Sequence, residues 1–294
     1  MVAGKKFNIV LHIIFILMAV CCLFPIMLTL SISLSSNKSL VENGYQLLPK
    51  DFSFEAYRYI FMDSTKIIRA YGVTIFNAIV GGTLSVLVIA HVAYPLSRSD
   101  FKLRKPITYY ILFTMLFSGG QVATYMVITT IYHLQNTIWV MILPCMMSPW
   151  YVVVLRTFFK TGVPTAIIES GKLDGAGELR ILWQLVFPIA LPGLATIALF
   201  QVLMYWNEWN LPLLYIVDPK LYNLQFLLQQ MMQNIQMINE NPEFAAQASA
   251  GLAEIPSEGA RMALCFVAMG PILITYPFFQ KYFIQGLTVG SVKE

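Results

Sequence analysis

Residues 163–177 read Val-Pro-Thr-Ala-Ile-Ile-Glu-Ser-Gly-Lys-Leu-Asp-Gly-Ala-Gly, and they lie between two long apolar runs. Pro164 suits the first position of a helix, because its fixed backbone angle is already close to helical. Three glycines then interrupt the pattern: Gly171, Gly175 and Gly177. Residues 178–187 are again helical in pattern, and Pro188 resets the chain. We therefore predict that the segment 160–188 forms two short helices that present one compact surface.

The chain around this segment is strongly apolar. Of its 294 residues, 57% are hydrophobic and 12% are charged, whereas about a quarter of an ordinary soluble domain is charged. A helix needs about 20 mostly apolar residues to cross a bilayer. Six stretches meet that length: 9–33, 73–95, 107–131, 138–159, 189–217 and 262–283. The sequence predicts an all-α membrane protein with six transmembrane helices, in which residues 1–294 form a single domain.

The basic residues predict the orientation of these helices. With the N-terminus inside, 12 of the 19 Lys and Arg residues fall in cytoplasmic segments, and short cytoplasmic loops are enriched in these residues. We expect both termini and the segment 160–188 to face the cytoplasm, and the segments 34–71 and 218–261 to lie outside. The first apolar run is too long for a signal peptide, so we expect an uncleaved membrane anchor.

The outer segment 218–261 contains one amphipathic pattern. Apolar residues recur there at helical spacing: Leu224, Leu227, Leu228, Met231, Met232 and Ile235. Glutamine and asparagine residues fill the positions between them, so the polar side carries no charge. We predict a helix that packs on the outer face of the protein, or alternatively one that touches a partner.

Motifs for catalysis are missing from the sequence. No stretch matches the P-loop that holds ATP phosphates, the H-E-x-x-H zinc motif or the G-x-S-x-G nucleophile elbow. The four cysteines fall inside predicted spans without metal-site spacing. The net charge of +4 is spread over loops, which argues against nucleic-acid binding. We expect a chain that is not an enzyme and has no catalytic, cofactor or metal residues.

The segment 163–188 closely resembles the E-A-A...D-G-A...P loop of binding-protein-dependent ABC importer permeases, particularly the maltose-type carbohydrate-uptake branch. The resemblance implies a type I importer permease fold with a cytoplasmic coupling helix that docks on an ATPase subunit. The residues at the motif positions are Glu169, Ser170, Gly171, Asp174, Gly175 and Ala176. The chain has E-S-G where the family usually has E-A-A. Small residues still permit close docking, although Gly171 costs about 1 kcal/mol of helix propensity relative to alanine.

The resemblance extends along almost the whole chain. Residues 93–98 are similar to the family's A-Y-x-L-S-R exit from the second span, and residues 280–293 are similar to the branch's C-terminal tail. Residues 277–283 resemble the subgroup that handles longer, more complex oligosaccharides. The sequence alone does not identify the sugar or its linkage.

A second cluster is similar to the W-N-[DE]-[FYW] element of carbohydrate permeases. Its members are Tyr205, Trp206, Asn207, Glu208, Trp209 and Asn210. At 1.5 Å per residue, Glu208 lies roughly 28 Å along its predicted helix, near the outer leaflet. An ionisable residue at membrane depth usually faces a cavity or a partner, so we expect a substrate pathway or a permease interface. For the two tryptophans, an interfacial aromatic belt is an equal alternative.

The family resemblance also implies partners. They are a second, similar permease, two copies of an ATPase that carries ATP and Mg, and an extracytoplasmic solute-binding protein that delivers sugar at the bacterial cytoplasmic membrane. The expected mechanism is alternating access. One alternative is an ABC importer permease for another solute. A more distant alternative is an ion-coupled secondary transporter, but such folds commonly show internal repeats, and none is evident here.

Overall fold

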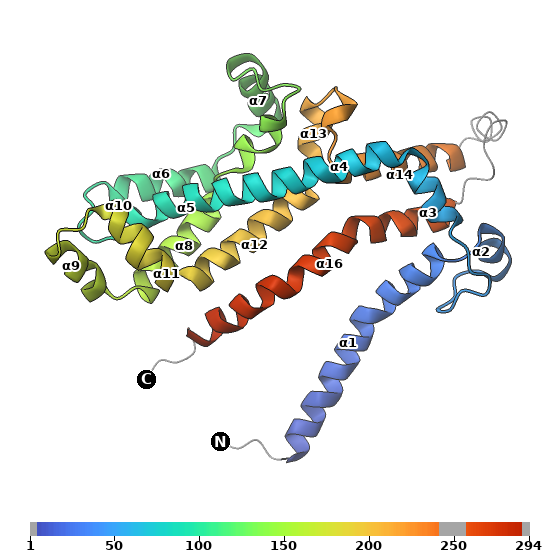
Figure 1. Ribbon diagram of the computed structural model, residues 1–294, viewed down its shortest axis with the longest axis horizontal. Coiled ribbons are helices and arrows are strands. Elements are labelled where there is room, and N and C mark those ends of the chain that lie inside the picture. The colour runs from blue at the N-terminus through green and yellow to red at the C-terminus, as the bar shows by residue number, and fades with distance from the viewer. Residues whose placement is uncertain (1–4, 241–256, 290–294) are drawn as a thin grey trace. The chain divides into compact units, whose positions relative to one another are not determined.

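The structure is a computed structural model, and it describes residues 5–240 and 257–289 (Figure 1). Within these ranges every regular element is a helix, and the only β-type pairing is an isolated bridge between Ser35 and Phe52. Residues 241–256 of the predicted outer segment 218–261 and residues 290–294 of the predicted tail lie outside the described ranges. The chain divides into two compact units, 1–67 with 228–270 and 68–227 with 271–294.

The first unit contains α1 (Lys5–Ser33), α2 (Asn37–Asn43) and α3 (Glu55–Ile60), with parts of α14 (Leu224–Glu240) and α16 (Ser257–Val289). The apolar stretch of α1 has no buried residues from Phe7 to Met27. A helix that is apolar on all sides and uncovered by protein suits lipid. This result agrees with the predicted first span. At the start of α16, Gly259 packs against Ala56 of α3.

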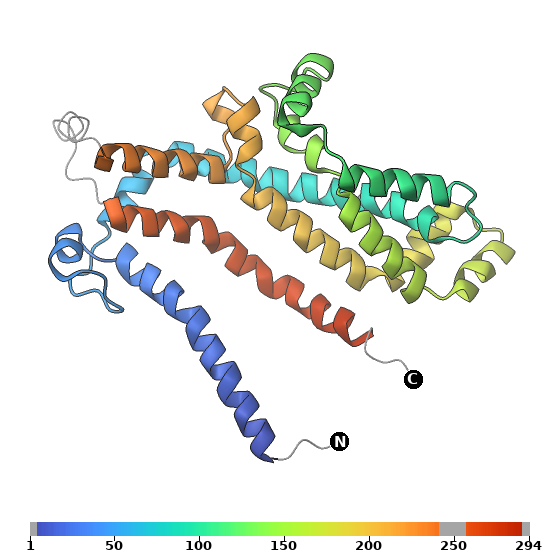
Figure 2. The same ribbon diagram turned by 180° about the vertical axis from the view of Figure 1, so that it is seen from behind.

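The second unit is built around α5 (Gly82–Ser97). This helix continues α4 (Ser64–Phe76) through a π-helical segment, η2 (Asn77–Gly81), and it packs against α8 (Pro149–Gly162) and α12 (Leu191–Asn207) (Figures 1 and 2). Buried residues from all three helices form the core, among them Ile89, Ala93, Val152, Leu155 and Ile197. Most are aliphatic, as expected where helices meet in a bilayer.

Glycines allow the helices of this unit to approach closely. A Cβ on Gly81 would lie 2.7 Å from Cζ of the Tyr205 ring, and one on Gly193 would lie 2.7 Å from Cδ1 of Phe158. Small residues at membrane helix contacts let the backbones come together, because packing and not the hydrophobic effect drives association in lipid. These two contacts set the spacing of α12 against η2 and α8.

Three of the predicted spans are bent. The segment 107–131 divides into α6 (Arg104–Leu116) and α7 (Gly120–Met126), which continues to Ile131, with an angle of 114°. Gly120 has φ +80°, a left-handed backbone that favours glycine, and it makes the turn possible. The segment 138–159 bends by 50° before α8. Among the described residues, two helices are unbroken candidate spans, Phe7–Ser33 and Ser64–Ser97, and the number is five if each of the three bent pairs is one span.

The fifth predicted span, 189–217, differs from the structure at both ends. It follows an 85° bend after α11 (Phe187–Ile189), and α12 ends at Asn207 before the short α13 (Asn210–Tyr215). The helical run from α10 (Glu178–Ile181) passes through the π-helical segment η6 (Leu182–Val186) into α11, and the predicted change of direction comes two residues after Pro188, at Ala190. The sixth predicted span, 262–283, falls within α16.

Candidate functional site

The predicted helical loop is present as α9 (Thr165–Leu173), which is followed by α10 (Glu178–Ile181) and η6. The end of α9 is a Schellman motif. The Gly175 N–H donates to the Lys172 carbonyl at 3.0 Å, and the Ala176 N–H donates to the Gly171 carbonyl at 2.9 Å. Gly175 has φ +76°, which only glycine adopts without a Cβ penalty. The D-G-A part of the loop therefore terminates the helix.

Gly171 lies where α9 touches the following helix. A Cβ at this position would meet Cδ1 of Leu185 at 2.8 Å and Cγ1 of Ile181 at 3.3 Å. Gly171 and Ile168 are buried on this side of α9. The departure from the usual E-A-A thus has a packing consequence in addition to its propensity cost: it brings α9 closer to α10 and η6.

The other side of α9 is open to solvent. Glu169, Ser170 and Asp174 are exposed, and the Leu173 side chain is 89% exposed. The residues at the six motif positions therefore fall into two groups. Gly171, Gly175 and Ala176 shape the loop, and Glu169, Ser170 and Asp174 are exposed.

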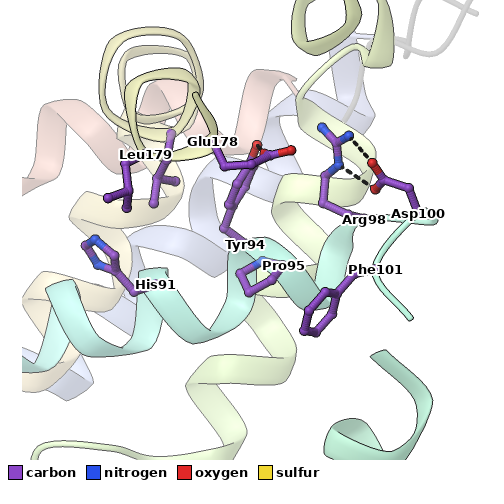
Figure 3. Close-up of a pocket in the computed structure, with 9 residues that line it drawn as sticks. His91, Tyr94, Pro95, Arg98, Asp100, Phe101, Glu178 and Leu179 are labelled. Carbon is purple, nitrogen blue, oxygen red and sulfur yellow. Dashed lines mark hydrogen bonds and ion pairs between the residues drawn. The ribbon is translucent and has the colours of Figure 1, made fainter. Parts of the chain in front are cut away.

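A charge cluster joins α9 to two other segments, the turn after α5 and the start of α10. We use this name for Tyr94, Arg98, Asp100, Lys172 and Glu178. Arg98 donates to both carboxylate oxygens of Asp100, at 3.0 Å and 2.8 Å (Figure 3). The Lys172 ammonium lies 2.9 Å from Oδ2 of Asp100 and 2.8 Å from Oε1 of Glu178. The Tyr94 hydroxyl donates to the other oxygen of Glu178 at 3.0 Å.

The cluster connects elements that are far apart in the sequence. Tyr94 lies in the last turn of α5, and Arg98 and Asp100 follow that helix. Lys172 belongs to α9, and Glu178 is the first residue of α10. The end of α5 is also held by Arg156 of α8, whose Nε donates to the Leu96 carbonyl at 2.9 Å.

The charges in the cluster shift one another's protonation. Hydrogen bonds from Arg98 and then Lys172 hold the pKa of the Asp100 carboxyl well below its ordinary value of 3.8. Hydrogen bonds to Glu178 and then Asp100 raise the pKa of Lys172 above its ordinary value of 10.5. The contribution of Asp100 to folding stability is therefore lost only as pH falls through its lowered pKa. The contribution of Lys172 is lost only as pH rises through its raised pKa. Both groups are charged across neutral pH.

Solvent limits the stability that the cluster provides. The Lys172 side chain is 39% exposed and the Asp100 side chain is 51% exposed, and exposed ion pairs contribute about 0–1 kcal/mol each. The geometry is more informative than the energy, because a single ammonium bridges two carboxylates, one held by Arg98 in the turn after α5 and one by Tyr94 of α5. Beside the cluster, a cavity of about 380 Å³ opens between the end of α5 and α10, with His91 and Leu179 in its walls (Figure 3).

Sequence reasoning singled out residues 93–98 and the loop that contains Lys172, but not their contact. Asp100 and Glu178 had no predicted role. The available signal was a basic residue, Lys172, on a predicted short helix, with carboxylates in the flanking loops. In the described residues no group of three or more His, Cys, Asp or Glu side chains is arranged to hold a metal.

The predicted cluster from Tyr205 to Asn210 divides into buried and exposed members. The Tyr205 hydroxyl lies 3.0 Å from the Ser85 hydroxyl and donates to the Ile142 carbonyl at 2.9 Å. The Trp206 side chain is also buried, with its ring centroid 6.5 Å from that of Tyr71. Asn207, Trp209 and Asn210 are exposed. The structure thus places the two ends of the motif in different environments.

Glu208 has a local structural contact. Its Oε1 accepts hydrogen bonds from the backbone N–H groups of Asn210 at 2.8 Å and Leu211 at 2.9 Å, which caps the start of α13. Its carbonyl accepts a hydrogen bond from the Asn223 side chain. A carboxylate at this position also matches the positive end of the helix dipole.

Comparison with known proteins agrees with this arrangement. Residues 2–289 match the family described as "Binding-protein-dependent transport system inner membrane component". The chain is 33% identical over 291 residues to the polygalacturonan/rhamnogalacturonan transport system permease protein YtcP of Bacillus subtilis, covering 99% of both chains. It is 25% identical over 288 residues to the trehalose/maltose transport system permease protein MalG of Thermococcus litoralis, covering 95% of this chain and 94% of that one.

A solved structure shows the same fold. It is a bacterial ABC transporter involved in the import of the acidic polysaccharide alginate, and the match has a TM-score of 0.80 at 26% sequence identity. The match covers 96% of this chain and 99% of the other. The chain therefore belongs to the family of binding-protein-dependent transport system inner membrane components, the non-catalytic permease subunits of ABC importers.

Proposed function

We propose that this chain imports oligosaccharides across the bacterial cytoplasmic membrane, as the permease subunit of an ATP-driven transporter. The observation that carries the proposal is the exposed α9, whose ends and packing are set by the residues of the coupling motif. Support for a carbohydrate comes from the full-length similarity to permeases named for polygalacturonan/rhamnogalacturonan and for trehalose/maltose, and to an alginate importer.

The proposed assembly contains a second permease, two ATPase subunits with ATP and Mg, and an extracytoplasmic solute-binding protein. In this assembly the exposed side of α9 docks on an ATPase subunit. The proposed contact residues and those that shape the contact are Glu169, Ser170, Gly171, Asp174, Gly175 and Ala176. Closure of the ATPases on ATP displaces α9, and the helices of the second unit turn the cavity between the permeases outward.

We assign the segment Tyr205 to Asn210 to the substrate pathway or the interface with the second permease. The exposed Asn207, Trp209 and Asn210 are the members available for such contact. Tyr205, Trp206 and Glu208 hold these residues in place through the buried hydroxyl contacts, ring packing and helix cap described above. Aromatic faces beside amide groups suit a sugar, which offers apolar ring faces and hydroxyl groups.

The test is ATP hydrolysis by this chain with its partner permease and ATPase, reconstituted in lipid with the binding protein. The panel contains oligogalacturonides, arabino-oligosaccharides, chitobiose and maltodextrins, with a polyamine and phosphate as non-sugar controls. Stimulation by one sugar-loaded binding protein would support the proposal and name the sugar class. Stimulation only by a control solute would support an ATP-driven importer but reject a carbohydrate substrate. Uptake driven by an ion gradient without ATP would reject both assignments.

A further inference from the structure

We propose that Lys172 is a positioning residue, which fixes the orientation of α9 relative to α5 by bridging Asp100 and Glu178. The proposal rests on the proposed role of α9 in coupling, and it assigns a function to a residue outside the coupling-motif positions. Its basis is the arrangement of the charge cluster.

The first step is that α9 depends on its surroundings for its orientation. It has nine residues, and isolated helices shorter than about 12–15 residues are marginal in water. Its apolar contacts lie along one side, through Ile168 and Gly171. The contact at Gly171 has no side chain to interlock with Ile181 and Leu185, so it sets a close distance without fixing an angle.

The second step is that both carboxylates bonded to Lys172 are themselves held by α5 or the turn after it. Asp100 receives two parallel hydrogen bonds from Arg98, a fork geometry that fixes the carboxylate plane. Glu178 receives a hydrogen bond from Tyr94. The Lys172 ammonium therefore reaches α5 by two routes, one directly through the turn and one through the start of α10.

The third step is that the Lys172 bridge links α9 to the α5 region, so a change in the tilt of α9 is transmitted to α5. α9 joins α8 at its N-terminal side and α10 at its C-terminal side, while α5 packs on α8 and α12. Without the bridge, α9 would still reach α8 and α10 through the chain, but its tilt would no longer be tied to α5. Loss of the bridge should thus change the orientation of α9 more than it changes the stability of the fold.

The experiment measures the distance between nitroxide spin labels at Thr165 and Lys102, both exposed, in the complete complex in lipid. The background replaces the four native cysteines, Cys21, Cys22, Cys145 and Cys265. Lys172→Met removes the charge and retains most of the side-chain length, and Lys172→Arg retains the charge. Lys160→Met is the matched control, because Lys160 is an exposed lysine of α8 outside the cluster.

We expect one narrow distance population in the parent, Lys172→Arg and Lys160→Met complexes, and a broad or shifted one in Lys172→Met. Asp100→Asn removes one of the two carboxylates that Lys172 bridges, so it should broaden or shift the distance less than Lys172→Met does. A narrow, unshifted population in Lys172→Met would overturn the inference while leaving the importer intact. If the parent complex shows the narrow population but no stimulation of ATP hydrolysis by any loaded binding protein, the proposed function fails while the positioning role of Lys172 stands, which is a separate result.

Discussion

At the scale of single residues, two glycines are buried at close contacts and face neighbours of different mobility. Gly81 lies against the ring of Tyr205, whose hydroxyl is bonded to Ser85 and Ile142. Gly171 lies against the terminal methyl of Leu185. The ring is fixed at both ends, whereas the leucine methyl can rotate away.

We expect this difference to separate two otherwise identical substitutions. Gly81→Ala should destabilise the permease by about 1–3 kcal/mol, the usual cost of overpacking. Gly171→Ala should have little effect on stability, because movement of Leu185 offsets the clash and alanine adds about 1 kcal/mol of helix propensity. Thermal unfolding of both variants in the same detergent compares them directly. Equal loss in the two variants would contradict the argument from the mobility of the neighbour.

Glu208 offers a second residue-scale test, because its cap and its charge are separable. Glu208→Ala removes the acceptor for the Asn210 and Leu211 N–H groups, which should cost about 0.5–2 kcal/mol, as for other helix caps. Glu208→Gln keeps an acceptor oxygen and removes the charge. If the carboxylate acts only as a cap, transport by Glu208→Gln should equal that of the parent protein. Impaired transport with unchanged thermal stability would place the charge in the pathway or at the permease interface.

At the scale of the element, α9 is a short helix with one side packed and one side exposed. Its packed side uses glycine and isoleucine, and its exposed side carries Glu169 and Leu173. The Schellman motif ends the helix after Leu173 and turns the chain into α10. The exposed side is thus held at a fixed position without contributing to the core.

This arrangement predicts that charge reversal at Glu169 impairs assembly with the ATPase subunits but not insertion of the permease into the membrane. Glu169→Lys should leave membrane insertion and thermal stability unchanged, since the side chain is exposed. It should weaken binding of the ATPase subunits, because it reverses a charge on the proposed docking surface. Glu42→Lys is the matched control, as Glu42 is an exposed carboxylate of α2 in the predicted outer segment. Co-purification of the ATPase with each variant measures the effect, and equal recovery would remove Glu169 from the contact.

At the scale of the whole molecule, local pattern predicted the helices well and their interruptions less well. The helix–break–helix form of residues 163–187 depends on glycine and proline positions within a few residues, and the structure confirms the two helices. The bends at residues 117–119 and at Ala190 lie inside stretches that are apolar enough to span. Hydropathy measures the transfer of side chains into lipid and does not depend on the direction of the backbone. It therefore could not predict these bends.

Contacts between distant segments set the other limit on prediction. The ion pair of Asp100 with Lys172 joins residues 72 positions apart, and the hydrogen bond of Ser85 with Tyr205 joins residues 120 apart. No spacing within a single helix contains this information, because it depends on how the turn after α5 meets α9 and on how α5 packs against α12. The motif positions of the coupling loop were predictable, but the residues that fix its orientation were not.

Orientation in the membrane is a whole-molecule prediction that single-cysteine variants can test. In a cysteine-free background, Lys220→Cys lies in the predicted outer segment, and Lys102→Cys lies in a predicted cytoplasmic loop; both positions are exposed. A membrane-impermeant maleimide should label position 220 in intact cells and position 102 only after permeabilisation. The reason is the excess of Lys and Arg on the inner side. The opposite pattern would place α9 outside, where it could not meet a cytoplasmic ATPase, and the coupling role would fall together with the orientation.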